Sequence, residues 1–311
     1  MSLYRPFLIA VLLVYSLSGF GKVSADTGAE VGAAISGAIG EDPAFDADHP
    51  AAVVELSIPS HGERLPGHIY LAAGEGPHPT VVLLHGFPGN ERNLDLAQAL
   101  RRFGFNVLYF QYRGAWGGSG SYRIGHLAED ALSVLEYLRD PTNAEKLRVD
   151  RSSLSFLGHS LGGFTALAAG AQDDEVQCVM ALSPANVGLW KLGGSDDPEA
   201  ARGLMAYADS LFMLADFSGE IMMDELATAE LADLDTRGFG EGLEGKAVLL
   251  MVGDRDDVTP ADTMLIPVAE AYREYEDIDL VARIIPGDHS FSSTRIRLIR
   301  ETLTFVESYC R

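Results

Sequence analysis

Residues 156–163 read Phe-Leu-Gly-His-Ser-Leu-Gly-Gly, between a short apolar run over 154–157 and a helix-like run over 164–169. A Gly-x-Ser-x-Gly pattern between strand and helix is typical of a tight turn that exposes the serine hydroxyl and leaves room only for small neighbours. The helix that follows directs its N-terminal N–H groups toward the serine, which suits a developing oxyanion. This stretch predicts a nucleophilic Ser160, with an ordinary turn capped by a serine as the alternative.

Composition and charge narrow the classes of function. The chain has 311 residues and is 47% hydrophobic, so it can form one large domain or two small ones. Its formal net charge of −22 argues against a nucleic-acid partner, because the phosphates would be repelled, and it disfavours an anionic membrane surface. We interpret the charge as an acidic, solvated surface.

The N-terminal segment resembles an export signal. Arg5 precedes an apolar run over 7–15 that is too short to span a membrane, and small residues end the segment at Ala25. We therefore predict a signal peptide over 1–25 and a secreted or periplasmic protein with no stable membrane insertion after its removal. An uncleaved N-terminal anchor is the alternative. Residues 26–50 lack a clear periodicity and are expected to form a flexible leader with at most a weak helix over 29–39.

The chain contains two cysteines, Cys178 and Cys310. In an oxidising compartment they could pair. Cys178 lies in an apolar run and Cys310 beside the C-terminus, so we expect one buried thiol and one thiol at a frayed end, with a disulfide as the alternative.

The remaining chain, residues 51–311, follows an α/β pattern. Residues 53–58 and 68–73 alternate apolar and polar side chains, which predicts an antiparallel pair of strands. Continuous apolar runs follow at 80–84, 106–109, 154–157, 176–182, 247–252 and 278–285. Helix-like segments alternate with them at 93–103, 125–139, 161–171, 261–276 and 292–308. Short buried strands that alternate with helices predict a parallel sheet with helices on both faces.

Residues 185–245 break this alternation. They contain helix-like stretches rich in Met and Leu but no convincing buried strand, and they are too long for a simple connection. We predict a helical cap over the carboxyl edge of the sheet, above an apolar, adaptable pocket. A peripheral insertion that does not contact the site is the alternative.

A nucleophilic serine needs a base, and the base needs a carboxylate to orient it. Both should follow strands, because the crevice of an open α/β sheet lies at the carboxyl ends of its strands. Of the histidines, only His289 follows a strand and directly precedes the last helix. Asp256 is the preferred acid in the stretch after the preceding strand, and its neighbours Asp254 and Asp257 remain alternatives.

Backbone N–H groups should form the oxyanion hole. Leu161 directly follows the nucleophile, and Phe87 lies in the loop after the first buried strand, where Pro88 has no N–H to offer. We expect His85, Trp116 and His159 to line the substrate pocket. His85 could instead pack beneath the loop, and Trp116 could belong to a surface loop.

These motifs resemble those of α/β-hydrolase-fold serine hydrolases over residues 53–309, within the bacterial prolyl-oligopeptidase-like and dienelactone-hydrolase-like branches. The residues that carry the resemblance are 85–89, Tyr112-Arg113-Gly114, 158–162, Gly253, Asp256, Pro260 and Asp288-His289. In that family a spacing of Gly, two residues, Asp, three residues and Pro marks the triad acid, which favours Asp256. The chain order Ser160, Asp256, His289 is that of this fold. The resemblance implies an eight-stranded, mostly parallel sheet and a cap after the sixth strand.

Taken together, the motifs predict an esterase-like serine hydrolase. Its substrate would be a small-molecule ester or a peptide, cleaved through an acyl-enzyme on Ser160, and no metal or organic cofactor is expected. A peptidase, an amidase or an acyltransferase on the same triad is the first alternative. A non-catalytic ligand-binding protein on a hydrolase scaffold is the second.

Overall fold

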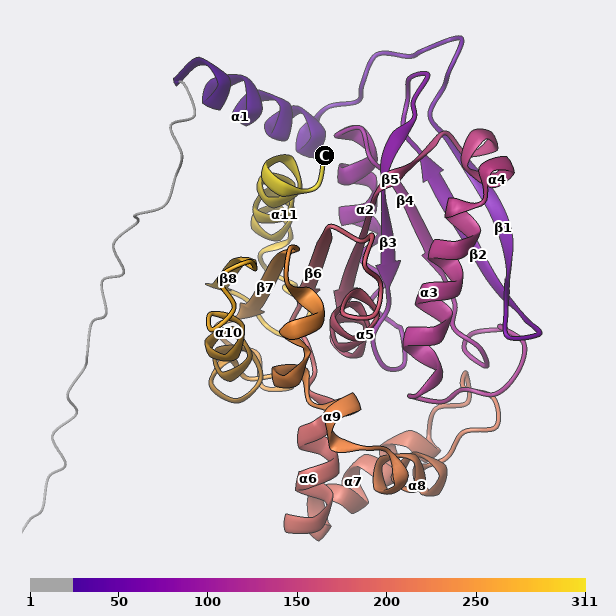
Figure 1. The fold of residues 1–311 in the computed structure, drawn as a ribbon, viewed down its shortest axis with the longest axis vertical. Coiled ribbons are helices and arrows are strands. Elements are labelled where there is room, and N and C mark those ends of the chain that lie inside the picture. Colours follow the sequence, from indigo (N-terminus) through magenta and orange to yellow (C-terminus); the bar gives the residue numbers. More distant parts are fainter. Residues whose placement is uncertain (1–24) are drawn as a thin grey trace, which may run out of the picture.

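The structure, a computed structural model, describes residues 25–311. Its strands form one eight-stranded sheet in the order β1-β2-β4-β3-β5-β6-β7-β8 (Figure 1). The strands are β1 (Ala52–Ser60), β2 (Glu63–Leu71), β3 (His78–Leu84), β4 (Asn106–Phe110), β5 (Val149–His159), β6 (Cys178–Leu182), β7 (Ala247–Gly253) and β8 (Asp279–Ile285).

The sheet is mostly parallel. β1 pairs with β2 and β2 with β4 in antiparallel register, whereas every neighbouring pair from β4 to β8 is parallel. This confirms the predicted fold class. A parallel arrangement collects the carboxyl ends of β3 to β8 at one edge, where the predicted site residues follow their strands.

Helices cover both faces of the sheet, and the five that the sequence predicts all form. They are α2 (Leu94–Arg102), α3 (His126–Arg139), α5 (Leu161–Gly170), α10 (Ile266–Tyr272, after a π-helical turn over Ala261–Leu265) and α11 (Arg295–Tyr309). Leu135 of α3 and Leu167 of α5 belong to the core on one face. Leu100 of α2 and Leu303 of α11 belong to the core on the other.

Two further helices were not expected in this form. α4 (Pro141–Lys146) begins with a proline, and the Asp140 side chain caps it by accepting hydrogen bonds from two N–H groups of its first turn. α1 (Ala25–Gly40) places Ile35 and Ala38 in the core formed by α2 and α11. The first part of the expected flexible leader is therefore a packed helix. Apart from Ala25, the predicted signal peptide lies outside the described residues.

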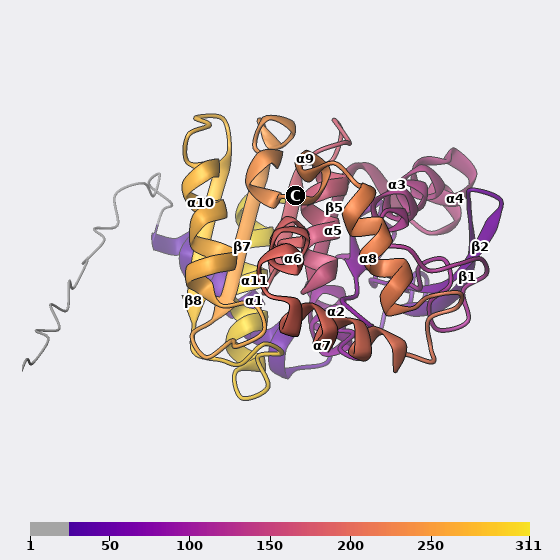
Figure 2. The same ribbon diagram turned by 90° about the horizontal axis from the view of Figure 1, so that it is seen from below.

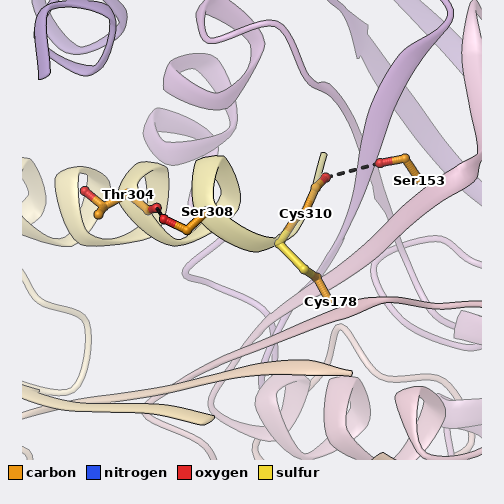
Figure 3. Close-up of a disulfide and its surroundings, with 5 residues drawn as sticks. All are labelled: Ser153, Cys178, Thr304, Ser308 and Cys310. Carbon is orange, nitrogen blue, oxygen red and sulfur yellow. Dashed lines mark hydrogen bonds between the residues drawn. A yellow bond between two sulfur atoms is a disulfide. The ribbon is translucent and has the colours of Figure 1, made fainter. Parts of the chain in front are cut away.

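The two cysteines form a disulfide, so the expectation of free thiols is wrong. Cys178 begins β6 and Cys310 follows α11, with their Cα atoms 5.7 Å apart. Figure 3 shows the bond, and the Ser153 hydroxyl that donates a hydrogen bond to the Cys310 carbonyl at 3.1 Å. Because α11 packs along the sheet, Cys310 lies at the first residue of β6 and is buried there.

Residues 185–245 are helical, as predicted. They form α6 (Val187–Asp196), α7 (Pro198–Asp209), α8 (Gly219–Thr228), α9 (Leu231–Leu234) and two 3-10 turns (Thr236–Phe239 and Glu241–Leu243). Figures 1 and 2 show α6 to α9 gathered beyond one end of the sheet.

Backbone hydrogen bonds join this helical segment to the loop that follows β4. The Trp116 N–H donates to the Met213 carbonyl at 2.9 Å, and the Ala215 N–H donates to the Gly114 carbonyl at 2.7 Å. Since β4 is parallel to its neighbour β3, the segment lies at the carboxyl edge of the sheet. Among residues 25–311, no helix has both the length and the hydrophobicity needed to cross a membrane.

Candidate active site

Ser160 lies on a strained turn between β5 and α5. Its φ is +60° and its ψ −122°, a conformation that side chains rarely adopt and that is found at functional turns. The flanking glycines have a steric reason. A Cβ on Gly158 would lie 1.8 Å from the Gly162 carbonyl oxygen, and a Cβ on Gly162 would lie 2.2 Å from the Leu84 carbonyl oxygen. The turn can therefore form only with glycine at both positions.

Asp256 and His289 face each other across the ends of β7 and β8. The His289 Nδ1 lies 2.9 Å from Asp256 Oδ2 and 3.1 Å from Oδ1. The Asp256 side chain is buried, and its Oδ1 also accepts hydrogen bonds from the N–H groups of Val258 and Thr259. Burial acts to raise the pKa of Asp256, but the hydrogen bonds from His289 and the Thr259 N–H outweigh it and hold that pKa well below its usual range. Asp256 is thus ionised and orients the imidazole.

The neighbouring aspartates occupy other positions. Asp254 is exposed, accepts a hydrogen bond from the Gly287 N–H at 3.0 Å and forms an ion pair with Arg255. Asp257 is exposed. Of the three acids considered, only Asp256 is hydrogen-bonded to His289.

Gly253, at the end of β7, allows the loop that carries His289 to approach. A Cβ at this position would lie 2.4 Å from the Gly287 carbonyl oxygen and 2.7 Å from that of Asp288. The backbone of the His289 loop therefore runs directly over Gly253. This contact explains why a glycine stands three residues before Asp256.

The loop after β3 lies against the serine. A Cβ on Gly86 would be 2.8 Å from the Ser160 Cβ and 3.4 Å from its Oγ. The N–H of Phe87 comes next in this loop, and among the described residues no group accepts a hydrogen bond from it. Leu161 occupies the first position of α5, where N–H groups have no partner within the helix. Both expected oxyanion donors thus belong to backbone next to Ser160.

The structure does not contain a hydrogen bond between Ser160 and His289. Within residues 25–311 the hydrogen bonds of the His289 ring go to Asp256 and Thr259. The backbones of Ser160 and His289 are nevertheless linked, because His159, the residue before Ser160, forms a hydrogen bond with the His289 carbonyl. Catalytic hydrogen bonds commonly shorten only when substrate binds.

Two of the three expected pocket residues are buried, which corrects that prediction. His85 packs beneath its own loop, with Nδ1 2.8 Å from the Gly86 carbonyl oxygen. This is the alternative that the sequence offered for His85. His159 is 4% exposed, and its Nε2 lies 2.8 Å from the His289 carbonyl. Burial lowers the pKa of each to about 4, so both rings are neutral at pH 7. Trp116 is half-buried and donates from Nε1 to the Pro88 carbonyl at 2.6 Å.

Thr259 is a site residue that the sequence analysis missed. Its hydroxyl lies 2.8 Å from Asp256 Oδ2, 3.1 Å from the Ser183 carbonyl and 3.2 Å from His289 Nδ1. It therefore links the acid, the base and the end of β6. The available signal was its position three residues after Asp256, where an aspartate side chain accepts hydrogen bonds from the backbone that follows.

Aromatic side chains connect the helical segment to the oxyanion loop. The Phe87 ring lies 5.8 Å from the rings of both Tyr207 and Phe217 and 6.1 Å from that of Tyr122, between ring centroids. These distances fall within the range of favourable aromatic pairs. Residues 185–245 therefore contact a residue that adjoins the serine. The described residues contain no group of three or more His, Cys, Asp or Glu side chains placed to hold a metal.

Comparison with known proteins gives a family match. The model described as "Alpha/beta hydrolase family" matches residues 81–296. Among curated proteins, an uncharacterized 31.7 kDa protein from the traX-finO intergenic region of Escherichia coli is 31% identical over 183 residues, which cover 56% of this chain and 60% of that protein. The match therefore spans less than two thirds of that relative's length.

Solved structures give the same fold. Est1E from Butyrivibrio proteoclasticus has a TM-score of 0.57 and 21% identity, covering 80% of this chain and 95% of that one. The uncomplexed acylaminoacyl peptidase from Pyrococcus horikoshii has a TM-score of 0.62 and 19% identity, covering 84% of this chain and 42% of that one. At such identities the likeness shows the fold alone.

Proposed function

Because this chain belongs to the alpha/beta hydrolase family, we propose that it is a serine hydrolase that cleaves carboxylic ester bonds through an acyl-enzyme on Ser160. The observation that carries the proposal is the strained turn of Ser160, at the same sheet edge as the Asp256–His289 pair. A hydroxyl needs an oriented base to become a nucleophile, and this edge provides one.

The reaction proceeds in two stages, formation of the acyl-enzyme and its hydrolysis. The Ser160 Oγ forms a bond to the acyl carbon while His289 Nε2 takes the hydroxyl proton. The tetrahedral intermediate then collapses, and the leaving alcohol takes that proton as the carbon–oxygen bond breaks. Water then attacks the acyl carbon and gives a proton to His289. His289 returns that proton to the Ser160 Oγ as the bond between this oxygen and the acyl carbon breaks, and the carboxylic acid leaves. Asp256 holds the Nδ1 proton of His289 and stabilises the imidazolium.

The oxyanion forms between two fixed backbone groups. The N–H groups of Phe87 and Leu161 donate to it from the loop after β3 and from the first turn of α5, where the helix dipole adds positive potential. The support is the close approach of Gly86 to Ser160. Each such donor is worth roughly 100- to 1,000-fold in rate.

The helical segment over 185–245 acts as the cap in this proposal. Tyr207 and Phe217 lie against Phe87, and half-buried Met213 and Met223 add flexible apolar surface nearby in the same segment. Such a lining favours apolar acyl or alcohol groups over charged ones. The substrate is therefore a small-molecule ester with an apolar group.

The protein is exported in this proposal, to a secreted or periplasmic location. Residues 1–25 have the composition of a signal peptide. The buried Cys178–Cys310 disulfide is typical of proteins that fold in an oxidising compartment. N-terminal mass analysis of the cell-envelope or medium fraction tests it, with a mature terminus after Ala25 as the expected result and an intact Met1 in the cytoplasmic fraction as the contrary one.

A panel of matched esters and amides tests the activity. We expect purified protein to hydrolyse p-nitrophenyl esters, and the p-nitroanilides of the same acyl groups much more slowly. Ser160→Ala should lower the ester rate by at least ~1,000-fold. Turnover of amides alone would replace the esterase proposal by a peptidase or amidase. Ester turnover that Ser160→Ala leaves unchanged would remove Ser160 from the mechanism.

A further inference from the structure

His159 links the serine turn directly to the loop that carries His289. Its Nε2 lies 2.8 Å from the His289 carbonyl oxygen, and the two imidazole rings are 4.8 Å apart between centroids. A carbonyl oxygen can only accept, so Nε2 carries the proton and donates. The contact thus joins the residue before the nucleophile to the backbone of the base.

We infer that His159 is a positioning residue that sets the distance between His289 and Ser160. The inference rests on the proposed roles of those two residues in ester cleavage. His159 does not touch the substrate and transfers no proton in this account. It acts through the His289 backbone alone.

One end of the link is rigid. Ser160 has a fixed backbone conformation at φ +60°, and Gly158 and Gly162 are packed so closely against backbone that the turn cannot shift without steric overlap. His159 is itself the last residue of β5, in the interior of the sheet. Its side chain therefore projects from a position that is constant relative to the Ser160 hydroxyl.

The other end of the link is a loop. Residues 286–294 connect β8 to α11, and Pro286 and Asp288 in it are exposed. Gly253 supports this loop from beneath, and Arg295 Nη1 donates to the Ser290 carbonyl at 2.9 Å. Of the bonds that hold the loop, the one from His159 connects it to the serine turn. Loss of that bond would leave the His289–Asp256 pair in place but loosen its distance from Ser160.

The surroundings of His159 keep it a neutral donor. Burial and the nearby His289 ring together lower its pKa to about 4, whereas the hydrogen bond to the His289 backbone and the Asp256 charge oppose the change. At pH 7 the ring is therefore neutral and carries no charge that could compete with the proton transfers of His289. Leaving a buried donor without an acceptor costs free energy, and this cost favours the state in which His159 is hydrogen-bonded to the His289 carbonyl.

A matched pair of substitutions separates the hydrogen bond from simple packing. Gln and Met have similar length and shape, but only Gln can donate to the His289 carbonyl. With a p-nitrophenyl ester, we expect His159→Met to lower kcat by ~10- to 100-fold with KM changed less than about twofold, because a displacement near 1 Å costs that much in rate. His159→Gln should recover most of the lost kcat.

His78 provides a control at the far end of β3. Its Nε2 lies 3.2 Å from the Gly74 carbonyl, so His78→Met also removes a histidine bond to a carbonyl, but away from the site. That variant should keep kcat within about twofold of the wild type. Thermal unfolding of all variants shows which of them are folded at the assay temperature.

The outcomes are decisive for the inference. A folded His159→Met with wild-type kcat overturns it, and so does a folded His159→Gln with kcat below a hundredth of the wild type. The second result decides the matter even if the Met variant does not fold. His289→Ala and Ser160→Ala are assayed in parallel. If either keeps full ester turnover the proposed function fails, whereas failure of the His159 variants alone leaves it intact.

Discussion

At the residue scale, the carboxylate that orients the base is buried and ionised at once. Asp256 achieves this by accepting hydrogen bonds from His289 and Thr259 and from the N–H of Val258. An ionised, buried carboxylate without such partners would take up a proton instead. Its negative charge thus stabilises the tautomer of His289 that carries the proton on Nδ1.

Asp256→Asn should disable the base while the fold is kept. Asn can face His289 but cannot stabilise its cation or impose the tautomer that leaves Nε2 free, so we expect kcat to fall by ~10⁴-fold. Ester hydrolysis under saturating substrate measures this. Asp257→Asn is the matched control, because Asp257 is adjacent, exposed and outside the pair. Equal effects of the two substitutions would argue against the assignment.

The same carboxylate should make stability depend on pH. The pKa of Asp256 is lower in the folded chain than in the unfolded one, so its ionised form stabilises the fold. That stabilisation is fully present above the unfolded pKa, near 4, and is lost as the pH falls below it toward the folded pKa. Urea unfolding of the wild type and Asp256→Asn at pH 6, 4 and 3 measures the free-energy difference, which should shrink with acid. A difference that grows on acidification would contradict this sign.

Sequence reasoning reached the reacting residues and missed their supports. Ser160 and His289 stand out because a strand precedes each and a helix follows, which places them at one sheet edge. His159 and Thr259 carry no such signal. Each contacts His289, which lies more than 25 residues away from either of them in the chain. Only the tertiary arrangement shows that His159 faces the His289 loop and not a substrate pocket.

At the element scale, the site depends on how the cap meets the loop after β3. Phe87 supplies an oxyanion N–H in our proposal, and its ring packs against Phe217 of the cap and Tyr122 of the loop after β4. In our proposal residues 185–245 therefore affect catalysis as well as substrate access. Sequence periodicity located residues 185–245 as a helical insertion, but it gave no means to pair Phe87 with a side chain about 130 residues away.

Phe217→Ala should weaken the turnover of esters with apolar acyl chains. An aromatic pair of this kind is worth about 1 kcal/mol, so we expect kcat/KM for p-nitrophenyl octanoate to fall by ~3- to 10-fold. Phe212→Ala is the control, because Phe212 belongs to the same segment but is 91% exposed. Identical kcat/KM values for the two variants would show that the Phe217 contact is unimportant for the substrate.

At the scale of the whole molecule, the disulfide ties the end of the chain to the interior of the sheet. β6 is a central strand of the sheet. α11 runs from beside the His289 loop to Cys310, which forms the disulfide with Cys178 of β6 (Figures 1 and 3). The parallel direction of the buried strands followed from the alternation of apolar runs and helices, whereas their order in the sheet did not. The pairing of cysteines did not, because it depends on the exact end point of α11.

Removal of the disulfide should cost stability more than activity. It closes a loop of 132 residues, and the loss of such a native bond typically costs about 2–5 kcal/mol. Guanidinium unfolding of Cys178→Ala/Cys310→Ala measures the change, and the ester rate of the same folded sample at 25 °C should remain within about twofold of the wild type. Undiminished stability in the double variant would show that the bond adds nothing to the fold.

Covalent labelling with a fluorophosphonate, followed by peptide mapping, is the sharpest test of Ser160 as the nucleophile. The reagent phosphonylates an activated serine and releases fluoride. We expect one label per chain, on Ser160 in the peptide that joins β5 to α5, and no label after Ser160→Ala or after heat unfolding of the wild type. A label on any other residue of the folded protein, or none at all, would contradict it.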